Sequence, residues 1–377
     1  MRTIVIGGGV GGATAALALR RIGAEVTVYE AYADPAGDVG SWISLAANGL
    51  RAVDALGCLE AVRAAGFEIE RQRMWSAGGM LIADVARGRR ESDTLRSVSL
   101  MRARLVAALR DAAAEAGAKI VTGVRLAAVA ETETETGPGV VATLEGGATD
   151  TADVLVAADG IWSTVRGALD PAAPVPQYAG LYSISGVAHL DGIDPGVFNM
   201  TFARNGAFLH VRAGDAVWWS AQVNSAEFVL DDLAGLFREE AVPAAIIAAT
   251  TQVHSATPMH VLEPVKTWHS DRIVLIGDAA HPVGAGQGAS MAIEDGLALA
   301  VCLQAEPTVA RALRRYDGER RPRIVKVLGT AEDNRNAKKA GPLKRRMQAA
   351  MMRIFVPMFY EKATAWLYSY EPAKLAK

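Results

Sequence analysis

Cysteine is almost absent from this chain of 377 residues, which holds only Cys58 and Cys302. The two residues form no Cys-x-x-Cys pair, so neither a dithiol redox centre nor a thiolate zinc site is favoured. A disulfide between them is left open, although no feature of the sequence favours one. The six histidines are scattered without the spacing of metal ligands. We therefore expect no metal site.

A strong net charge and long apolar runs are lacking as well. The formal net charge is -2, which gives no general attraction to nucleic acid or to an anionic membrane. No uninterrupted apolar run reaches the length of about 18 residues that a transmembrane helix needs. The N-terminus does not have the charged region, apolar core and cleavage site of a signal peptide. The sequence predicts a soluble, cytoplasmic protein.

What is present is a core-forming composition with a β-α-β pattern at the start. Hydrophobic residues make up 51% of the chain and charged residues 21%, as in globular proteins with a sizeable core. The length allows two domains, or one large domain with an insertion. Thr3 to Ile6 is a β-branched run typical of a buried strand. Val10 to Arg21 predicts a helix rich in small residues, and Ala24 to Glu30 a second strand. Together they make one β-α-β unit.

Beyond this unit, the predicted secondary structure changes from mixed to mainly strands and then to helices. Asn48 to Ala65 is expected to be helical, strand-like runs dominate from about 176 to 272, and helices follow from Thr308. These patterns predict an α/β fold: a Rossmann-like domain with an inserted, mostly antiparallel β-sheet domain and a C-terminal helical segment. The basic stretch from Lys338 to Arg346 is interpreted as a solvated helical face rather than a membrane or polyanion surface. The expected division is 1–70, 98–175 and 273–330 for the first domain, 71–97 and 176–272 for the second, and 331–377 for the C-terminal helices.

A Gly-x-Gly-x-x-Gly motif joins the first strand to the first helix. Gly7 permits a tight turn, Gly9 lets a pyrophosphate approach the backbone, and Gly12 lets the helix pack closely on the strand. Glu30 ends the second strand, 18 residues after Gly12 (30 − 12), where an acid accepts hydrogen bonds from ribose hydroxyls. The motif predicts a bound dinucleotide, but NAD and FAD use the same cradle.

Two later motifs distinguish between these dinucleotides. Asp159-Gly160 and Gly277-Asp278 each follow an apolar, strand-like run, and no second Gly-x-Gly-x-x-Gly is present. With these three motifs in this order, the chain resembles the FAD-dependent aromatic hydroxylases, the single-component flavoprotein monooxygenases with the p-hydroxybenzoate hydroxylase fold. The resemblance covers about residues 1 to 330. It implies FAD as cofactor.

The resemblance also implies roles for individual residues. Gly7, Gly9 and Gly12 would hold the FAD pyrophosphate and Glu30 the adenosine ribose. Arg102 matches an Arg-x-x-Leu at a helix start that reaches the flavin phosphate and ribityl region. The remaining positions implied by the family are Ser44 near the ribityl chain, Val124 at the adenine, Asp278 on a ribityl hydroxyl, and Asp159 in handling both FAD and the nicotinamide dinucleotide.

The glycine-rich stretch after Asp278 has a physical role of its own. A reduced flavin carries negative charge near N1 and the C2 carbonyl, and a helix N-terminus with exposed N–H groups stabilises such charge. Gly286, Gln287 and Gly288 are the candidates for this contact.

The activity implied by the resemblance is a monooxygenase reaction. NADPH or NADH would reduce FAD as a transient co-substrate, O2 would form a flavin C4a-hydroperoxide, and its distal oxygen would hydroxylate an aromatic or polycyclic small molecule. The protein would act as a monomer or homodimer.

Two departures keep other reactions open. Trp42 stands where the family commonly has a small glycine, and only four residues separate His281 from Gly286, about two fewer than usual. Epoxidation, oxidative decarboxylation or dehydrogenation on the same fold are therefore alternatives, and a non-catalytic binder of this fold is a remote one.

Candidate substrate contacts lie in the strand-rich region. His210 and Arg212 alternate along one predicted strand and so share a face. His210 is a candidate base because its ordinary pKa lies near the working pH, and Arg212 and Trp218 are candidates for binding the substrate. Ordinary packing is the competing interpretation for His210 and Trp218, and His281 is interpreted as structural.

Overall fold

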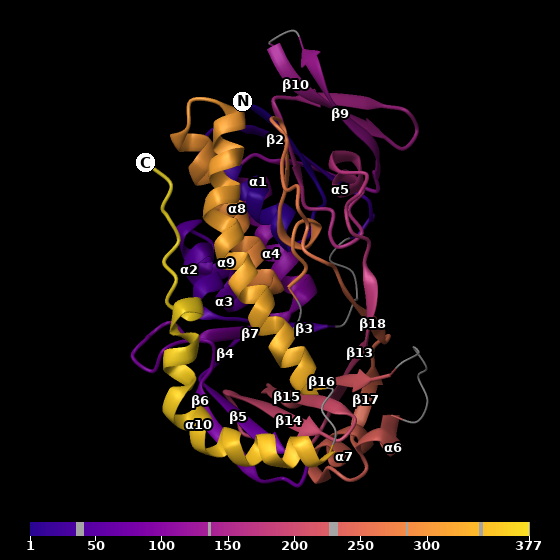
Figure 1. The fold of residues 1–377 in the computed structure, drawn as a ribbon, viewed down its shortest axis with the longest axis vertical. Coiled ribbons are helices and arrows are strands. Elements are labelled where there is room, and N and C mark those ends of the chain that lie inside the picture. Colours follow the sequence, from indigo (N-terminus) through magenta and orange to yellow (C-terminus); the bar gives the residue numbers. More distant parts are fainter. Residues whose placement is uncertain (35–40, 135–136, 226–232, 284–285, 339–341, 377) are drawn as a thin grey trace.

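The computed structural model describes residues 1–34, 41–134, 137–225, 233–283, 286–338 and 342–376 (Figure 1), and the side chains of 331–350 are not described. Two sheets dominate the arrangement. A parallel sheet lies in the upper half of Figure 1, together with both chain ends, and a larger, mostly antiparallel sheet lies in the lower half.

The parallel sheet is assembled from distant parts of the chain. Its strand order is β19-β12-β1-β2-β8 and each pairing is parallel. Both faces are covered, which is why β1 and β12 are apolar runs rather than alternating ones. The strands are β1 (Arg2–Ile6), β2 (Glu25–Glu30), β8 (Lys119–Thr122), β12 (Val154–Ala157) and β19 (Ile273–Leu275).

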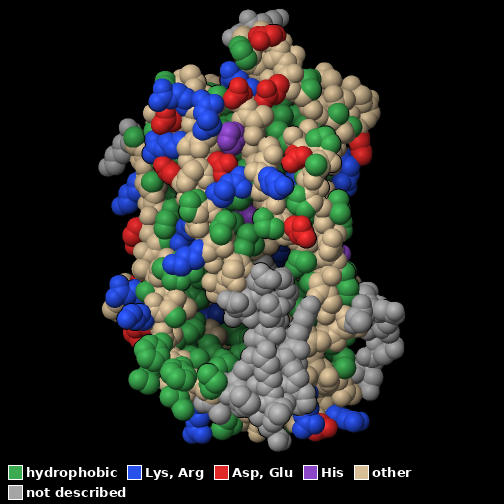
Figure 2. Space-filling model, viewed as in Figure 1, with side chains coloured by type: hydrophobic (Ala, Val, Ile, Leu, Met, Phe, Trp, Pro, Cys, Tyr) green, Lys and Arg blue, Asp and Glu red, His purple; other side chains and the backbone are tan. Residues whose placement is uncertain are grey.

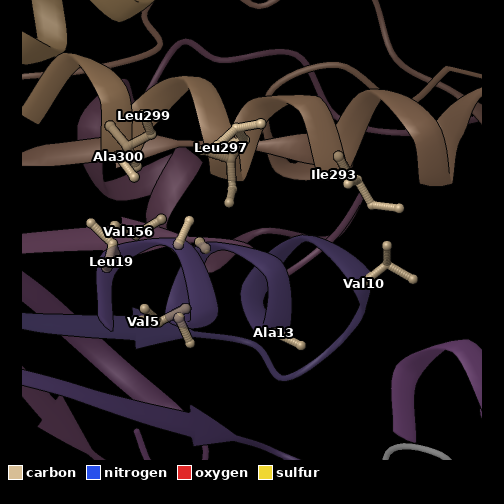
Figure 3. Close-up of a cluster of buried hydrophobic side chains, with 14 of the residues drawn as sticks. Val5, Val10, Ala13, Leu19, Val156, Ile293, Leu297, Leu299 and Ala300 are labelled. Carbon is tan, nitrogen blue, oxygen red and sulfur yellow. The ribbon is translucent and has the colours of Figure 1, made fainter. Parts of the chain in front are cut away.

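Two helices packed on this sheet run in the same direction. They are α1 (Val10–Arg21) and α8 (Gly288–Ala305). Figure 3 shows Val10 opposite Ile293 at one end of the pair, and Leu19 at the other end, near Leu299 and Ala300. A Cβ at Gly296 would lie 2.8 Å from the backbone nitrogen of Ala15, so the helices cross at close range. Both helix N-termini therefore lie at the same edge of the sheet.

In the described part of the chain the second sheet has eight strands, and two short helices cover one of its faces. Every pairing is antiparallel except β14 with β5, which is parallel. Helices α6 (Leu233–Phe237) and α7 (Ala241–Ala248) pack through Phe237 and Ile246 on the face that holds Phe208 and Trp219. The strands are β5 (Arg71–Ser76), β6 (Leu81–Ala86), β13 (Gln177–Ala188), β14 (Val197–Ala203), β15 (Gly206–Ala213), β16 (Ala216–Asn224), β17 (Thr250–Val253) and β18 (Thr257–Val261).

Smaller elements connect the two sheets. A three-stranded sheet of β3 (Trp42–Leu45), β7 (Ser97–Met101) and β4 (Phe67–Ile69) leads into α4 (Arg102–Glu115). The other described elements are α2 (Ala47–Ala55), α3 (Leu59–Ala64), β9 (Leu126–Thr134), β10 (Gly137–Leu144), β11 (Thr149–Ala152), α5 (Thr164–Leu169), the 3₁₀ helix η1 (Gly277–Ala279), α9 (Val309–Lys338) and α10 (Pro342–Tyr368).

The predicted fold class is confirmed: a parallel α/β sheet, a mostly antiparallel sheet and C-terminal helices are all present. The helical structure expected from Asn48 to Ala65 is present, although the chain turns at Gly57 with φ +71° and so forms two helices, α2 and α3. The expected domain bounds stay a prediction. In the described part of the chain no helix is both long and apolar enough to cross a membrane.

Candidate functional site

The predicted cofactor residues follow the carboxyl ends of four neighbouring parallel strands. Gly7 follows β1, Glu30 ends β2, Asp159 follows β12 by two residues, and Gly277 follows β19 by two. Because β2, β1, β12 and β19 are adjacent in this order, these positions lie along one edge of the sheet. That edge is where ligands bind in open parallel sheets.

The three glycines of the first loop have three different surroundings. Gly7 has φ +98°, and a Cβ there would lie 2.4 Å from the carbonyl oxygen of Ala158. At Gly12 a Cβ would lie 1.8 Å from the Gly7 oxygen, so only glycine allows α1 to start this close to β1. At Gly9 a Cβ would meet no atom of the described residues within 4 Å. Gly9 thus presents bare backbone at the start of α1.

The end of α1 at this loop offers unpaired donors. Gly9 is the N-cap residue, and no side chain caps the helix by hydrogen bonding. The first turn also lacks an acidic residue. Its free N–H groups and the partial positive charge of the helix N-terminus therefore suit a phosphate.

Glu30 connects this loop to the end of β2 through hydrogen bonds. Its carboxylate is buried and accepts hydrogen bonds from the backbone nitrogen of Gly8 at 2.6 Å and of Tyr32 at 2.8 Å. Each carboxylate oxygen has a second acceptor position, which could serve a ribose hydroxyl. Val124 lies beside it, since its N–H donates to the Glu30 carbonyl at 2.9 Å. An adenine contact at Val124 would then use its carbonyl group.

Asp159 contributes a carboxylate with an unused oxygen. Its Oδ2 accepts a hydrogen bond from Val165 N at 3.2 Å, at the start of α5. Its Oδ1 is buried and has no hydrogen-bond partner among the described residues. Burial raises the pKa of this carboxyl group above its usual range. A ligand hydroxyl at Oδ1 would supply the missing donor.

Asp278, in the Gly277-Asp278 motif, lies close enough to Arg102 for their charges to interact. Its side chain is accessible to solvent, yet enough protein surrounds it that desolvation raises its pKa, against the attraction of His281 and Arg102. This combination fits the floor of a cleft. Arg102 begins α4 and donates its backbone N–H to Ser41. A Cβ at Gly288 would lie 3.8 Å from Asp278 Oδ1, so the start of α8 lies there as well.

The glycines before α8 form a second uncapped helix start. Gly286 has φ +98°, Gln287 is the N-cap residue, and neither a capping side chain nor an acid occupies the first turn. Gln287 Oε1 lies 3.4 Å from Asn48 Nδ2. Residues 284 and 285 of the short stretch after His281 lie outside the described residues. The N-termini of α1 and α8 both open on this edge.

Several buried polar atoms around this edge lack partners in the described structure. They are Ser44 Oγ on β3, Asn48 Oδ1 on α2, Ser290 Oγ on α8 and Asp159 Oδ1. Unpaired buried acceptors and hydroxyls are rare in folded proteins and call for a polar ligand or water. These unpaired atoms, together with the space next to Gly9, are consistent with a site for a long, polar dinucleotide.

A buried ionic network under this edge was not predicted from the sequence. Asp295 on α8 contacts His281 Nε2 at 2.6 Å, Arg320 Nε at 2.8 Å and the Gly277 N–H at 2.9 Å. Burial opposes ionisation of Asp295, but His281 and Arg320 hold its pKa well below its usual range. Glu294 binds Arg320, Arg323 and Asn48. The adjacent pair Glu294-Asp295 inside an apolar helix was the available signal.

The second sheet presents an aromatic face towards the cofactor-binding part. Trp42 on β3 contacts Phe198 edge-on, with ring centroids 5.6 Å apart, and Trp218 contacts Phe67 at 5.4 Å. Met200, Leu209 and Val211 belong to the same apolar cluster. Trp42 pairs with Met101 in the strand register, directly before Arg102. The aromatic face therefore adjoins the wall that holds Arg102.

Arg87 supplies a positive charge on this face and was missed from the sequence. It follows β6, its guanidinium carbon lies 3.9 Å from the ring centroid of Phe198, and its Nη1 donates to Gln72 at 2.7 Å. Its Nε is buried and has no partner among the described residues. One arginine in an arginine-rich segment gives no sequence signal, because only the strand pairing turns it inward.

The predicted substrate contacts separate onto the two faces of the sheet. His210 lies with Phe208 on the face covered by α6 and α7, where it lines a cavity of about 410 Å³ with Asn199 and Glu240. Arg212 donates to the carbonyls of Leu190 and Gly214. Trp218 belongs to the aromatic face. The structure thus brings Trp218 together with Trp42 and Phe198, and places His210 and Arg212 away from them.

Comparisons with known proteins agree with this geometry. The family model described as "FAD binding domain" matches residues 1–331. Aurachin C monooxygenase/isomerase of Stigmatella aurantiaca is 30% identical over 334 residues, covering 85% of each chain. Kynurenine 3-monooxygenase of Salinispora arenicola is 33% identical over 371 residues, covering 88% of this chain and 79% of the relative.

A solved structure shows the same fold. Klebsiella pneumoniae HpxO complexed with FAD and uric acid superposes with a TM-score of 0.81 at 23% identity, covering 94% of this chain and 92% of the other. The family match and the curated relatives are sufficient to assign the chain. It is an enzyme of the FAD-binding flavoprotein monooxygenases and aromatic hydroxylases, and FAD is its cofactor.

Proposed function

We propose that this enzyme uses NADPH or NADH and O2 to hydroxylate an aromatic small molecule that carries an anionic group. The observation that carries the proposal is the aromatic face of Trp42, Phe198 and Trp218, which adjoins the FAD edge and includes the cation Arg87. Aromatic rings bind such a face by offset or edge-on packing.

FAD would supply the redox chemistry when bound, by accepting reducing equivalents from the nicotinamide and reacting with O2. The protein residues would bind and orient it. Gly7, Gly9 and Gly12 would hold the pyrophosphate, Glu30 and Val124 the adenosine, and Ser44 with Asp278 the ribityl chain. Arg102 would reach the flavin phosphate and ribityl region, and Asp159 would take part in handling both FAD and the nicotinamide dinucleotide.

The start of α8 would set the electrostatics at the flavin ring. Gly286, Gln287 and Gly288 precede or begin a helix without an acid in its first turn. Its partial positive charge favours the anionic, reduced form of the ring.

The first experiment measures oxidation of NADPH and NADH by the purified, FAD-loaded enzyme with a panel of aromatic acids. Oxidation stimulated by an aromatic acid, together with an oxygenated product, supports the proposal. If neither nicotinamide reduces the flavin in the presence of any aromatic acid, the monooxygenase assignment for this chain fails.

A second experiment tests Arg87 as the group that binds the substrate anion. We expect Arg87→Gln to raise KM for an aromatic carboxylate about 10- to 100-fold, as expected for loss of a charged hydrogen bond, and to leave KM for the corresponding amide nearly unchanged. Arg96→Gln is the control, because Arg96 is an exposed arginine paired with Glu68. Equal effects of Arg87→Gln on the acid and the amide would remove Arg87 from the substrate site.

Trp42 favours one alternative reaction class on the same site. Its bulky ring occupies the wall next to Arg102, where it would restrict the space between flavin and substrate. Dehydrogenation transfers no oxygen atom to the substrate, so it would tolerate the restricted space between flavin and substrate. Isotopically labelled O2 separates the two reactions, because only the monooxygenase incorporates label into the product.

A further inference from the structure

Helix α10 has apolar side chains on two opposite sides. On its inner side Met352, Val356 and Tyr360 pack against the cluster of Met74 and Val85 on β5 and β6. On its outer side Met351, Ile354, Phe355, Met358 and Phe359 are between 46% and 69% exposed. A helix that is apolar on all sides is normally buried on all sides. Among the described residues, the outer side of this part of α10 is therefore an exposed apolar surface.

The exposed side chains gather in one place rather than being scattered. Figure 2 shows them as a group of hydrophobic side chains at the lower left, over α10. Met80 and Leu81, each 40% exposed, extend this surface from the β5–β6 hairpin, and Arg353 contacts the Met80 sulfur. We call the seven apolar residues the α10 surface. A grouped apolar surface on a protein marks an interaction site.

Charge indicates which partner covers it. From its start at Pro342 to Tyr360, α10 contains four cationic residues (Lys344, Arg345, Arg346 and Arg353) and no acidic residue. The whole chain has a net charge of -2, so the remainder carries −6 (−2 − 4). A second copy of this chain would bring the same cations against each other. An anionic lipid surface complements them and also accepts the apolar side chains.

We propose that α10 docks the enzyme on an anionic membrane surface, lying in the plane of the interface with its outer side chains among the lipids. Helices with apolar residues and flanking cations bind membranes in this way without crossing them. The basic residues from 344 to 346 on α10 are then part of the docking segment, and not only of a solvated helical face.

The test measures co-sedimentation of the FAD-loaded enzyme with vesicles of phosphatidylcholine, alone or with about a third phosphatidylglycerol. We expect partitioning onto the anionic vesicles to be at least about tenfold stronger, and to weaken at high salt. Phe355→Glu with Met358→Glu should return it to the level of phosphatidylcholine alone. Val175→Glu with Val253→Glu is the matched control, because both valines are exposed elsewhere and the charge change is equal.

Two further measurements make each outcome decisive. Flavin content and thermal unfolding establish that each variant is folded, and a Lys344→Gln, Arg345→Gln, Arg346→Gln variant tests the cations without touching the apolar residues. Folded enzyme that binds neither vesicle overturns the proposal. So does a concentration-dependent dimer in sedimentation velocity that the Phe355→Glu, Met358→Glu variant dissociates while vesicle binding is absent, because the α10 surface would then join two copies.

Discussion

At the scale of the residue, the three glycines of the first loop separate cofactor binding from folding. A Cβ at Gly9 would meet no atom of the described residues within 4 Å, whereas Gly12 has no room for a side chain. We expect Gly9→Ala to weaken FAD binding and leave the melting temperature of the FAD-free protein almost unchanged. Gly12→Ala should lower that melting temperature as well, because its Cβ would overlap the Gly7 carbonyl.

Gly11→Ala is the control for both, since its Cβ would make an ordinary contact 3.5 Å from the Ala292 Cβ. The readouts are flavin absorbance per protein and calorimetry of the FAD-free form. If Gly9→Ala and Gly12→Ala destabilise the FAD-free protein equally, the two glycines do not have the separate roles inferred here.

The burial of His210 makes the stability of the protein depend on pH. Burial lowers its pKa from 6.5 to about 4. Between these two values the unfolded chain binds a proton and the folded chain does not, so stability falls as the pH is lowered through this window. The full effect is on the order of 3 kcal/mol. Above pH 6.5 both forms are neutral and the effect is absent.

We therefore expect His210→Gln to flatten the pH dependence of urea unfolding between about pH 7 and about pH 4.5. His189→Gln provides the control for loss of an exposed histidine. An unchanged slope in the His210 variant would mean that this ring gains a proton in the folded state.

At the scale of the element, the ionic network links α8, α9 and the Gly277 turn. Arg320 on α9 is fully buried with Asp295 and Glu294. Removing one partner of a buried pair leaves an uncompensated charge, so Arg320→Met should cost about 3–5 kcal/mol of unfolding free energy. The low pKa of Asp295 adds stability above the pH at which the unfolded carboxyl ionises, and this stability is lost on acidification.

Arg315→Met is the matched control, because Arg315 forms an exposed pair with Glu319 one turn away on the same helix. Urea unfolding of both variants near neutral pH measures the difference. A small, equal effect of the two substitutions would show that the network adds little to stability.

The elements also show what could be predicted from the sequence. The β-α-β start and the glycine motifs were readable because backbone geometry demands particular residues at Gly7 and Gly12. Which face of β15 lies towards the cofactor was not readable from the sequence. The polar residues His210 and Arg212 share a face with Phe208 and suggested that face, whereas Leu209 and Val211 on the other face belong to the aromatic cluster. Arg87 and the Asp295 network depend on long-range pairing, which local patterns do not encode.

At the scale of the whole molecule, the cofactor would join segments from both ends of the chain, from Gly7 to Gly288. A ligand that binds only the folded state adds about 2.7 kcal/mol at a hundredfold excess over Kd. We expect FAD to raise the melting temperature of the FAD-free protein more than FMN does at equal concentration, because FMN lacks the adenosine that Glu30 and Val124 would hold. Equal shifts with FAD and FMN would show that the first loop binds no adenosine.

The order of the parallel sheet has a consequence for how the chain is made. β1 emerges first from the ribosome, yet its neighbour β12 begins at Val154 and the edge strand β19 at Ile273. The first strand is thus synthesised long before the strand that pairs with its other side. Such distant pairings slow folding and leave apolar strands exposed in the nascent chain. The edge of the parallel sheet that binds FAD can form only after about three quarters of this sequence, up to β19 and the start of α8, has been translated, which makes cofactor loading a late event in biosynthesis.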